Sequence, residues 1–220
     1  AIALALAAEG ARVIAVARPS ADLAELRALV GEGGETWALD VTGDELLARI
    51  ESSGPLDVLV NNAGTNRPEA LVDVADATLD DLWDLNVRSV FRVSRAAVRT
   101  MRPGASIVNV TSQMGHVGSP LRTVYCMTKH AVEGLSKAMA VELAPRGIRV
   151  NCVAPTFVET PMTGPMLADP DFRAFVDRMI PLGRLATPEE VAAAVVYLAS
   201  PASGMVTGHS LLIDGGWTAQ

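Results

Sequence analysis

The sequence predicts an α/β fold in which residues 1–220 form a single doubly wound parallel sheet with helices on both faces. Short apolar runs recur along the chain, and most of them are apolar at every position, which is typical of strands covered on both faces. Segments with helical periodicity lie between these runs. Alternating strands and helices imply βαβ units and hence a parallel sheet. The chain has no internal repeat or linker-like stretch, which favours one domain.

The expected strands coincide with the short apolar runs, at Arg12–Ala17, Thr36–Leu39, Val58–Val60, Ser106–Val110, Arg149–Val153 and Ser210–Ile213. The expected helices lie between them, at Ala1–Glu9, Ser20–Gly31, Thr42–Ser52, Thr78–Met101, Val124–Leu143 and Pro188–Leu198. The last helix has a clear start, because Thr187 can cap it, Pro188 takes the first helical position and acids follow. The segment Pro155–Pro181 has weak periodicity and follows a strand, so we expect a lid or binding loop there.

One expected feature of a nucleotide-binding fold of this type lies outside the sequence. Such a fold opens with a strand and a glycine-rich turn at the start of the first helix. The chain begins inside that helix, so the first strand and the glycine-rich turn are missing from it. Because the later motifs are intact, we expect these residues to precede Ala1 in the protein, and the alternative is a truncated protein.

The composition of the chain limits which partners, which cell compartment and which metal requirement we expect for the protein. The net charge of −7 and the pI of about 5.0 disfavour nucleic acid, whose phosphates an acidic protein repels. No apolar run approaches the roughly 20 residues needed to span a bilayer. Cys126 and Cys152 lie in apolar stretches without CxxC spacing, which predicts buried thiols in a cytoplasmic protein. A chain of this length can fold without a metal, and we expect no metal site.

The strongest chemical signal is Tyr125-Cys-Met-Thr-Lys129 in the helix expected at Val124–Leu143. Residues four apart share one helix face, so the ammonium of Lys129 lies beside the phenol of Tyr125. A positive charge favours phenolate, and we expect it to lower the pKa of Tyr125 from about 10 towards neutrality. Such a tyrosine can exchange a proton with a substrate oxygen. Taken alone the pattern is weak, because Tyr/Lys pairs at this spacing are common on exposed helices.

Two polar residues lie where they could assist this pair. Ser112 follows the strand expected at Ser106–Val110, so its hydroxyl lies at the carboxyl edge of the sheet, where open α/β sheets bind ligands. Asn86 lies inside the helix expected at Thr78–Met101, although asparagine is a modest helix former. Its amide could hold a water molecule or the lysine. Without a role in catalysis, Ser112 would be an ordinary turn serine and Asn86 a hydrogen-bonded asparagine of the core.

Two other strand ends carry small or acidic residues. Asn61-Asn-Ala-Gly64 follows Val58–Val60, and its small residues would let the backbone approach a flat ring closely. Asp40-Val41 ends the strand at Thr36–Leu39, where a carboxylate can accept a hydrogen bond from an adenine amino group. The alternatives are an ordinary strand-to-loop turn for the first motif and a helix N-cap for Asp40.

Together these motifs resemble the short-chain dehydrogenase/reductase family, in both order and spacing. The resemblance covers nearly the whole chain and rests on Asp40-Val41, Asn61–Gly64, Asn86, Ser112, Tyr125–Lys129, Arg149-Val-Asn-Cys-Val-Ala-Pro155 and Asp214-Gly-Gly216. It implies a Rossmann-type domain with a seven-stranded parallel sheet, a bound NAD or NADP, and a homotetramer. It also implies a catalytic tetrad of Asn86, Ser112, Tyr125 and Lys129.

The same resemblance implies a set of cofactor-binding residues. Val158 and Thr160 would contact the nicotinamide carboxamide, and the rest of the site would comprise Arg18, Asp40, Val41, Asn61, Ala63, Gly64, Tyr125, Lys129 and Pro155. The chain departs from the family pattern in two places. The glycine-rich TGxxxGxG turn is absent, and Thr156 stands where the family usually has glycine after Pro155.

The end of the first predicted strand indicates the form of the cofactor. Enzymes specific for NAD place an acid there to bind the ribose 2′-hydroxyl, whereas NADP enzymes use a nearby arginine. Here Ala17 takes the position of the acid and Arg18 follows it. A guanidinium can bind a 2′-phosphate through several hydrogen bonds, so the sequence predicts NADP(H) as the cofactor, with NAD(H) as the alternative. Arg18 could instead be an ordinary surface arginine.

Within the family, the chain most resembles the L-xylulose (dicarbonyl) reductase group. Shared features are Ala17-Arg18, Ala21-Asp22-Leu23, Gly54-Pro55, Ser112-Gln113, Tyr125-Cys126, Pro155-Thr156, Ile180-Pro-Leu-Gly183 and Ser203-Gly-Met-Val-Thr-Gly208. That group carries a histidine in its substrate site three residues before the tyrosine, and this chain has Arg122. An arginine there suits a carboxylate or several hydroxyls. We nevertheless expect Arg122 to face solvent on a loop.

The function expected from these residues is hydride transfer between NADP(H) and a carbonyl or secondary alcohol, with a sugar or small dicarbonyl as substrate. A 3-oxoacyl thioester reductase of the same family is one alternative, although no basic patch for an acyl carrier protein is evident in the sequence. A non-catalytic NADP-binding sensor is another. All four tetrad residues are present, which favours an enzyme.

Overall fold

The computed structural model describes residues 1–161 and 163–220. In this part of the chain the strands are all parallel. They are β1 (Ile14–Ala17), β2 (Glu35–Ala38), β3 (Val58–Asn61), β4 (Ser106–Val110), β5 (Arg149–Pro155) and β6 (Ser210–Ile213). Each overlaps a strand expected from the sequence, so the short apolar runs predicted the strands correctly.

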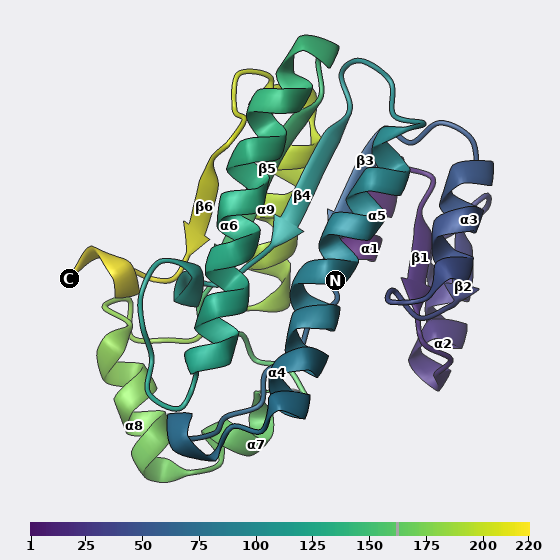
Figure 1. Ribbon diagram of the computed structural model, residues 1–220. Coiled ribbons are helices and arrows are strands. Elements are labelled where there is room, and N and C mark those ends of the chain that lie inside the picture. Colours follow the sequence, from purple (N-terminus) through teal and green to yellow (C-terminus); the bar gives the residue numbers. More distant parts are fainter. Residues whose placement is uncertain (162) are drawn as a thin grey trace.

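The helices cover both faces of the strands (Figure 1). They are α1 (Ile2–Ala8), α2 (Ala21–Leu29), α3 (Asp44–Ser52), α4 (Asp76–Trp83), α5 (Ser89–Val98), α6 (Thr123–Leu143), α7 (Gly164–Leu167), α8 (Pro170–Met179) and α9 (Pro188–Ala199). In Figure 1, α5 and α6 lie in front of the strands, and α9 lies behind them with α1 packed against it. The predicted class, a parallel sheet with helices on both faces, is confirmed.

The strands form two hydrogen-bonded parts. β1 pairs with β2, and the other strands follow the order β3-β4-β5-β6. The edges of β1 and β3 face the same cavity from opposite sides and do not pair with each other. Ala1 and Ile2, at the start of the chain, also line this cavity.

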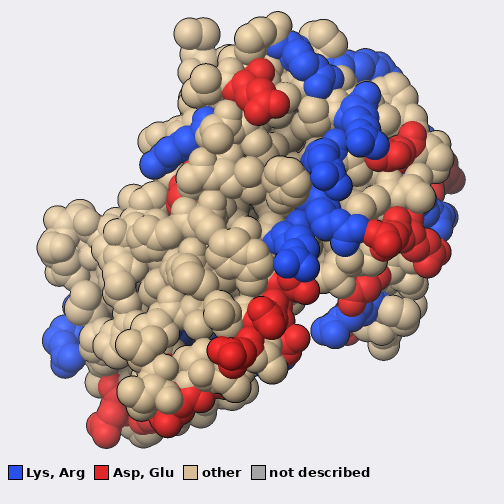
Figure 2. All heavy atoms as spheres, in the orientation of Figure 1, with Lys and Arg blue, Asp and Glu red and all other residues tan. Residues whose placement is uncertain are grey.

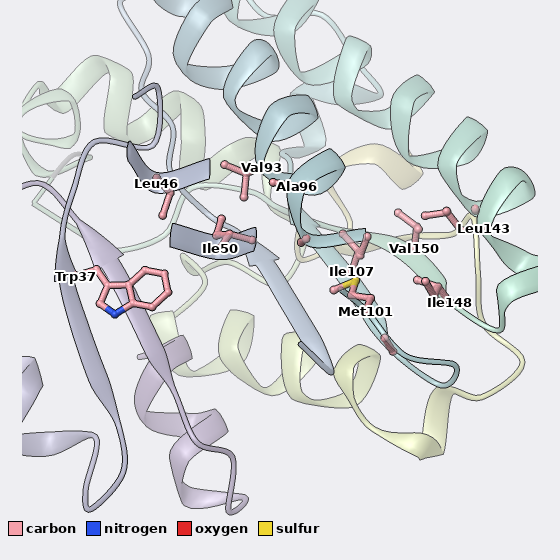
Figure 3. Packing of buried hydrophobic residues seen from close by; sticks show 13 residues of the cluster. Trp37, Leu46, Ile50, Val93, Ala96, Met101, Ile107, Leu143, Ile148 and Val150 are labelled. Atoms are coloured by element: carbon pink, nitrogen blue, oxygen red, sulfur yellow. The ribbon is translucent and has the colours of Figure 1, made fainter. Parts of the chain in front are cut away.

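A hydrophobic cluster joins the two parts of the sheet. Figure 3 shows Trp37 of β2 with Leu46 and Ile50 of α3 on one side, and Ile107 and Val150 of the larger sheet on the other. Residues of α5 lie between these groups, because α3 packs against α5 and α5 against β3. No helix in the described part of the chain combines the length and apolarity that crossing a bilayer requires.

The segment predicted as one helix, Thr78–Met101, is interrupted. A π-helical turn at Asp84–Arg88 separates α4 from α5, and Asn86 lies inside this turn. The wider turn accompanies hydrogen bonds between the Asn86 side chain and the backbone of Thr65. Single π-helical turns inside longer helices are frequent at functional sites.

The segment Pro155–Pro181 is more regular than its weak periodicity predicted, because it contains α7 and α8. Met162, in the same segment, lies outside the described residues. Asp169 caps α8 by accepting hydrogen bonds from the backbone of Asp171 and Phe172, and Pro170 takes the first helical position. A capping residue followed by proline and an acid is a sequence pattern that marks the start of a helix, and it occurs both at Asp169-Pro170-Asp171 before α8 and at Thr187-Pro188-Glu189 before α9. In Figure 1, α7 and α8 lie below the end of α6 where that helix begins.

Candidate active site

A cavity of about 930 Å³ opens at the carboxyl ends of β3, β4 and β5 and extends between β1 and β3. Most of the residues proposed from the sequence line it: Val41, Asn61, Ala63, Gly64, Ser112, Tyr125, Lys129, Pro155, Val158 and Thr160. Three others, Arg18, Asp40 and Asn86, lie outside its lining. The structure therefore gathers chain segments far apart in the sequence around one space at the edge where open α/β sheets bind ligands.

Tyr125 and Lys129 lie on the first two turns of α6. The Lys129 ammonium is buried and lies 5.5 Å from the centroid of the Tyr125 ring. Its Nζ donates a hydrogen bond to the Val110 carbonyl oxygen at 3.0 Å. This bond holds the lysine between α6 and the end of β4, so the ammonium is fixed beside the aromatic ring rather than in solvent.

Ser112 begins a short 3₁₀ turn directly after β4 and is buried. Its Oγ accepts a hydrogen bond from the Met114 backbone N–H at 3.1 Å and donates one to Gln113 Oε1 at 2.8 Å. Ser112 is therefore held by its own turn, with the Tyr125 phenol as a further hydrogen-bonding neighbour.

The protonation of this pair differs from the expectation drawn from spacing. Burial raises the pKa of Tyr125 to about 12, and a hydrogen bond with Ser112 offsets only part of this rise. Burial lowers the pKa of Lys129 to about 8. The expected shift of the tyrosine pKa towards neutrality is wrong for this structure, because desolvation of the phenol dominates. At neutral pH Tyr125 is a protonated acid.

Asn86 is fully buried, and its hydrogen bonds are made within the protein. The Thr65 N–H donates to Asn86 Oδ1 at 2.9 Å, and Asn86 Nδ2 donates to the Thr65 carbonyl at 2.9 Å and to Thr128 Oγ1 at 3.2 Å. These bonds tie the segment after Gly64 to α6. A Cβ added at Gly64 would lie 3.2 Å from Asn86 Oδ1 and 3.6 Å from Lys129 Nζ. Asn86 thus positions the backbone beside the lysine.

Arg18 and Asp40 are exposed and follow the adjacent ends of β1 and β2. Hydrogen bonds from the Thr42 N–H and hydroxyl to Asp40 Oδ1, at 2.8 and 2.7 Å, lower the pKa of this carboxyl. The positive charge of Arg18 lowers it further, so the two side chains lie near each other. Asp40 therefore orders its own turn without capping α3, whose N-cap is Gly43, while Arg18 has no ion pair within the described residues.

The polar side chains around the cavity include Asn61, which was proposed from the sequence, and three others that were not. Asn61 Nδ2 donates to Asn109 Oδ1 at 2.8 Å and to Ser94 Oγ at 3.0 Å, so this side chain ties β3 to β4 and α5. Other side chains line the cavity with buried polar atoms that lack a hydrogen-bond partner, namely Asn66 Oδ1, Gln113 Nε2 and Thr156 Oγ1. Buried polar atoms are rarely left unpaired, so these three are suited to contact a ligand.

The expectation that Arg122 faces solvent is wrong. Only 5% of the residue is exposed, because Met166 of α7 and Phe172 of α8 pack against its guanidinium. These contacts join residues more than forty positions apart, which no local pattern indicates.

The fold and the position of the cavity place the chain among the doubly wound α/β proteins, which bind ligands at the carboxyl edge of the sheet. A family profile described as enoyl-(acyl carrier protein) reductase matches residues 1–218. An L-xylulose reductase of Bos taurus is 42% identical over 98% of this chain and 89% of its own length. The chain therefore belongs to the short-chain dehydrogenase/reductase family.

Other relatives differ in their named substrates. The 3-oxoacyl-[acyl-carrier-protein] reductase FabG of Vibrio harveyi is 39% identical over 98% of this chain and 91% of its own length. A gluconate 5-dehydrogenase of Burkholderia cenocepacia J2315, crystallised with NADP and tartrate, superposes with a TM-score of 0.92 at 31% identity, covering 100% of this chain and 90% of its own. The relatives thus share the fold but not a single substrate class.

Proposed function

We propose that the protein is an NADP(H)-dependent oxidoreductase that acts on a carbonyl or secondary alcohol of a sugar or small dicarbonyl. The observation that carries this proposal is the convergence of Ser112, Tyr125 and Lys129 on one cavity, with a protonated phenol beside a buried ammonium. NADP complexes of solved relatives support the choice of cofactor, as does Arg18 at the end of β1.

The residues present fit a nicotinamide dinucleotide. The cavity runs from the carboxyl ends of the strands into the space between β1 and β3, and Gly64 leaves its backbone open beside Lys129. The unpaired Thr156 Oγ1 and Asn66 Oδ1 suit a ligand that carries amide and hydroxyl groups. Arg18 would hold the 2′-phosphate, and Pro155, Val158 and Thr160 would lie against the nicotinamide.

A further part of the proposal concerns the space between β1 and β3. Both edges carry backbone groups that could pair with another parallel strand, and Ala1 lines the same cavity. We infer that residues 1–220 belong to one domain, in which a further parallel strand and a glycine-rich turn that holds the pyrophosphate occupy this space.

In this proposal each tetrad residue has a distinct task. The bound cofactor supplies the hydride in reduction. The Tyr125 hydroxyl donates its proton to the substrate oxygen as that oxygen becomes an alcohol, and the Lys129 ammonium stabilises the phenolate that remains. Ser112 lies beside the phenol and orients the substrate oxygen. Asn86 acts as a positioning residue, because it contacts Thr65 and Thr128 rather than the cavity.

The buried lysine predicts how the rate depends on pH. Lys129 is charged below its pKa of about 8 and loses its stabilising charge above it, whereas Tyr125 keeps its proton up to about pH 12. We expect kcat/KM for carbonyl reduction to be constant near neutral pH and to fall roughly tenfold per pH unit above the lysine pKa. Steady-state kinetics across this range measure the profile. A flat profile well above the lysine pKa would contradict this role.

The rival substrate class, a thioester on an acyl carrier protein, finds little support on the visible surface. Figure 2 shows basic side chains along α5 with acidic side chains beside them. Arg88 pairs with Asp84 at 3.0 Å, Arg99 pairs with Glu51, and Arg92 with Asp44, so this stripe is largely neutralised. The sensor alternative is disfavoured because the catalytic groups converge on the cavity.

Oxidation of NADPH in the presence of L-xylulose, 2,3-butanedione or an acetoacetyl thioester tests the substrate class directly. We expect turnover with the first two. A clear preference for the thioester would favour the rival reductase, and NADPH binding without turnover of any carbonyl would favour the sensor.

We propose a homotetramer on the basis of apolar side chains on the outer faces of α5 and α6. Phe91 is 46% exposed, Met127 43% and Val141 79%, and such residues favour burial between subunits. Light scattering at micromolar concentration should give about four times the mass of one chain. A monomeric mass would refute this assembly.

The two free cysteines are consistent with a cytoplasmic location, which we also propose.

A further inference from the structure

The guanidinium of Arg122 is buried with few hydrogen-bond acceptors. Its Nη1 donates to the Leu121 carbonyl at 3.3 Å and its Nη2 to Met166 Sδ at 3.3 Å, while Nε has no partner. A thioether sulfur is a weak acceptor. Among the residues that the structure describes, no Asp or Glu forms an ion pair with Arg122. A buried charge without a counter-ion is costly, and an anionic ligand would relieve that cost.

The surroundings of Arg122 leave room for such a ligand. A second cavity of about 410 Å³ is lined by Arg122, Phe172 and apolar residues of the loop before α6. Met166 lines both this cavity and the larger one, so it separates the guanidinium from the space that holds Tyr125. Asp169 also lines the second cavity, but its Oδ1 is engaged in capping α8. Rotation of the flexible Met166 side chain would join the two spaces.

Arg122 also lies close to the reacting group. It directly precedes α6 and is three residues before Tyr125, a spacing that places side chains near one another at the start of a helix. The charge of Arg122 lowers the pKa of Tyr125, although burial dominates and raises it. A ligand bound to the guanidinium can therefore present another of its groups to the phenol.

We infer that Arg122 binds a carboxylate of the substrate, so that an oxo acid or hydroxy acid, such as a sugar acid, is preferred to a neutral sugar. This inference rests on the proposed function and narrows its substrate class. A planar guanidinium matches a carboxylate through two parallel hydrogen bonds, and the apolar walls strengthen that pairing. A phosphate dianion would call for further positive groups, and no second Lys or Arg lines the described part of this cavity.

A matched pair of substrates tests the inference. 5-Oxogluconate and L-sorbose share the same ketone and hydroxyls and differ in a carboxylate against a hydroxymethyl group at the distal end. We expect the wild type to favour 5-oxogluconate in kcat/KM, and Arg122→Gln to reduce that value roughly ten- to a hundredfold while leaving L-sorbose nearly unchanged. Arg122→Lys should retain part of the preference, because it keeps the charge without the two-pronged geometry.

Arg173→Gln provides the matched control. It removes an arginine charge from α8 that pairs with Asp177 at 2.9 Å and does not line either cavity, so the substrate preference should stay as in the wild type. Equal losses on both ketoses in Arg122→Gln would mean that Arg122 only supports the fold. A wild type that prefers L-sorbose would also overturn the inference.

Direct binding separates this inference from the proposed function. Calorimetry with tartrate and its neutral counterpart threitol requires no turnover, so it applies even if neither ketose is reduced. Tartrate should bind the wild type more tightly than threitol, and Arg122→Gln should remove the difference. Inorganic phosphate that binds more tightly than tartrate would contradict the assignment to a carboxylate. If Arg122→Gln melts early, the same comparison is made with Arg122→Lys, in which an unchanged tartrate affinity would overturn the inference.

Discussion

Replacing Tyr125 with phenylalanine should lower kcat for carbonyl reduction by at least about a hundredfold, the usual size of a general-acid contribution. The substitution removes one hydroxyl and leaves the ring against the ammonium of Lys129. Because Tyr125 is protonated at neutral pH, the lost group is the proton donor itself. The rate of NADPH oxidation under saturating carbonyl measures the effect.

The chain offers a control for this substitution in its other tyrosine. Tyr197 lies on α9 and is 42% exposed, so Tyr197→Phe should leave kcat unchanged. Cofactor affinity, followed by fluorescence titration, should be nearly the same in both variants and the wild type. Tyr125 is not the acid if Tyr125→Phe keeps more than roughly a hundredth of the wild-type rate.

Arg18→Ala should weaken NADPH binding by roughly ten- to a hundredfold, because a hydrogen bond to a charged group contributes about 1.5–3 kcal/mol. NADH carries no 2′-phosphate, so its affinity should hardly change. The structure supports this assignment by placing Arg18 at the exposed end of β1 without an ion pair in the described chain. Ala17→Asp should act in the opposite sense, since a carboxylate repels the phosphate and accepts a hydrogen bond from the ribose.

Arg27→Ala tests whether this effect is specific to position 18. Arg27 lies exposed in the last turn of α2 and does not line the cavity, so its removal should affect both cofactors little. Titrations of NADPH and NADH against each variant give the comparison. Equal losses of the two cofactors in Arg18→Ala would show that Arg18 supports the fold or the adenine. A wild type that prefers NADH would refute the assignment to NADP.

The parts of the fold that depend on local signals were predictable from sequence. The strand Ser106–Val110 and the helix after Thr187 lie where apolar runs and capping residues placed them. The π-helical turn could not be predicted, because it accompanies bonds from Asn86 to Thr65, twenty-one residues away. Weak periodicity concealed α8, although Asp169 and Pro170 marked its start.

In the candidate site, too, features that depend on local sequence could be predicted and features that depend on distant contacts could not. Spacing along one helix sufficed to bring Tyr125 and Lys129 together, but it could not give their pKa values, which depend on burial by segments distant in sequence. The burial of Arg122 could not be predicted for the same reason, because the side chains that cover it, Met166 and Phe172, come from another part of the chain. Local pattern thus identified the chemical groups, and tertiary packing determined their state.

The π-helical turn at Asp84–Arg88 makes the length of this segment as important as its composition. Successive residues of a helix are about 100° apart around its axis, so the loss or gain of one residue in the turn would rotate α5 by that angle relative to α4. Val93 and Ala97 would then leave the core, and arginines of the outer stripe would enter it. We therefore expect natural variants of this segment to tolerate exchanges of side chains far better than insertions or deletions of a single residue.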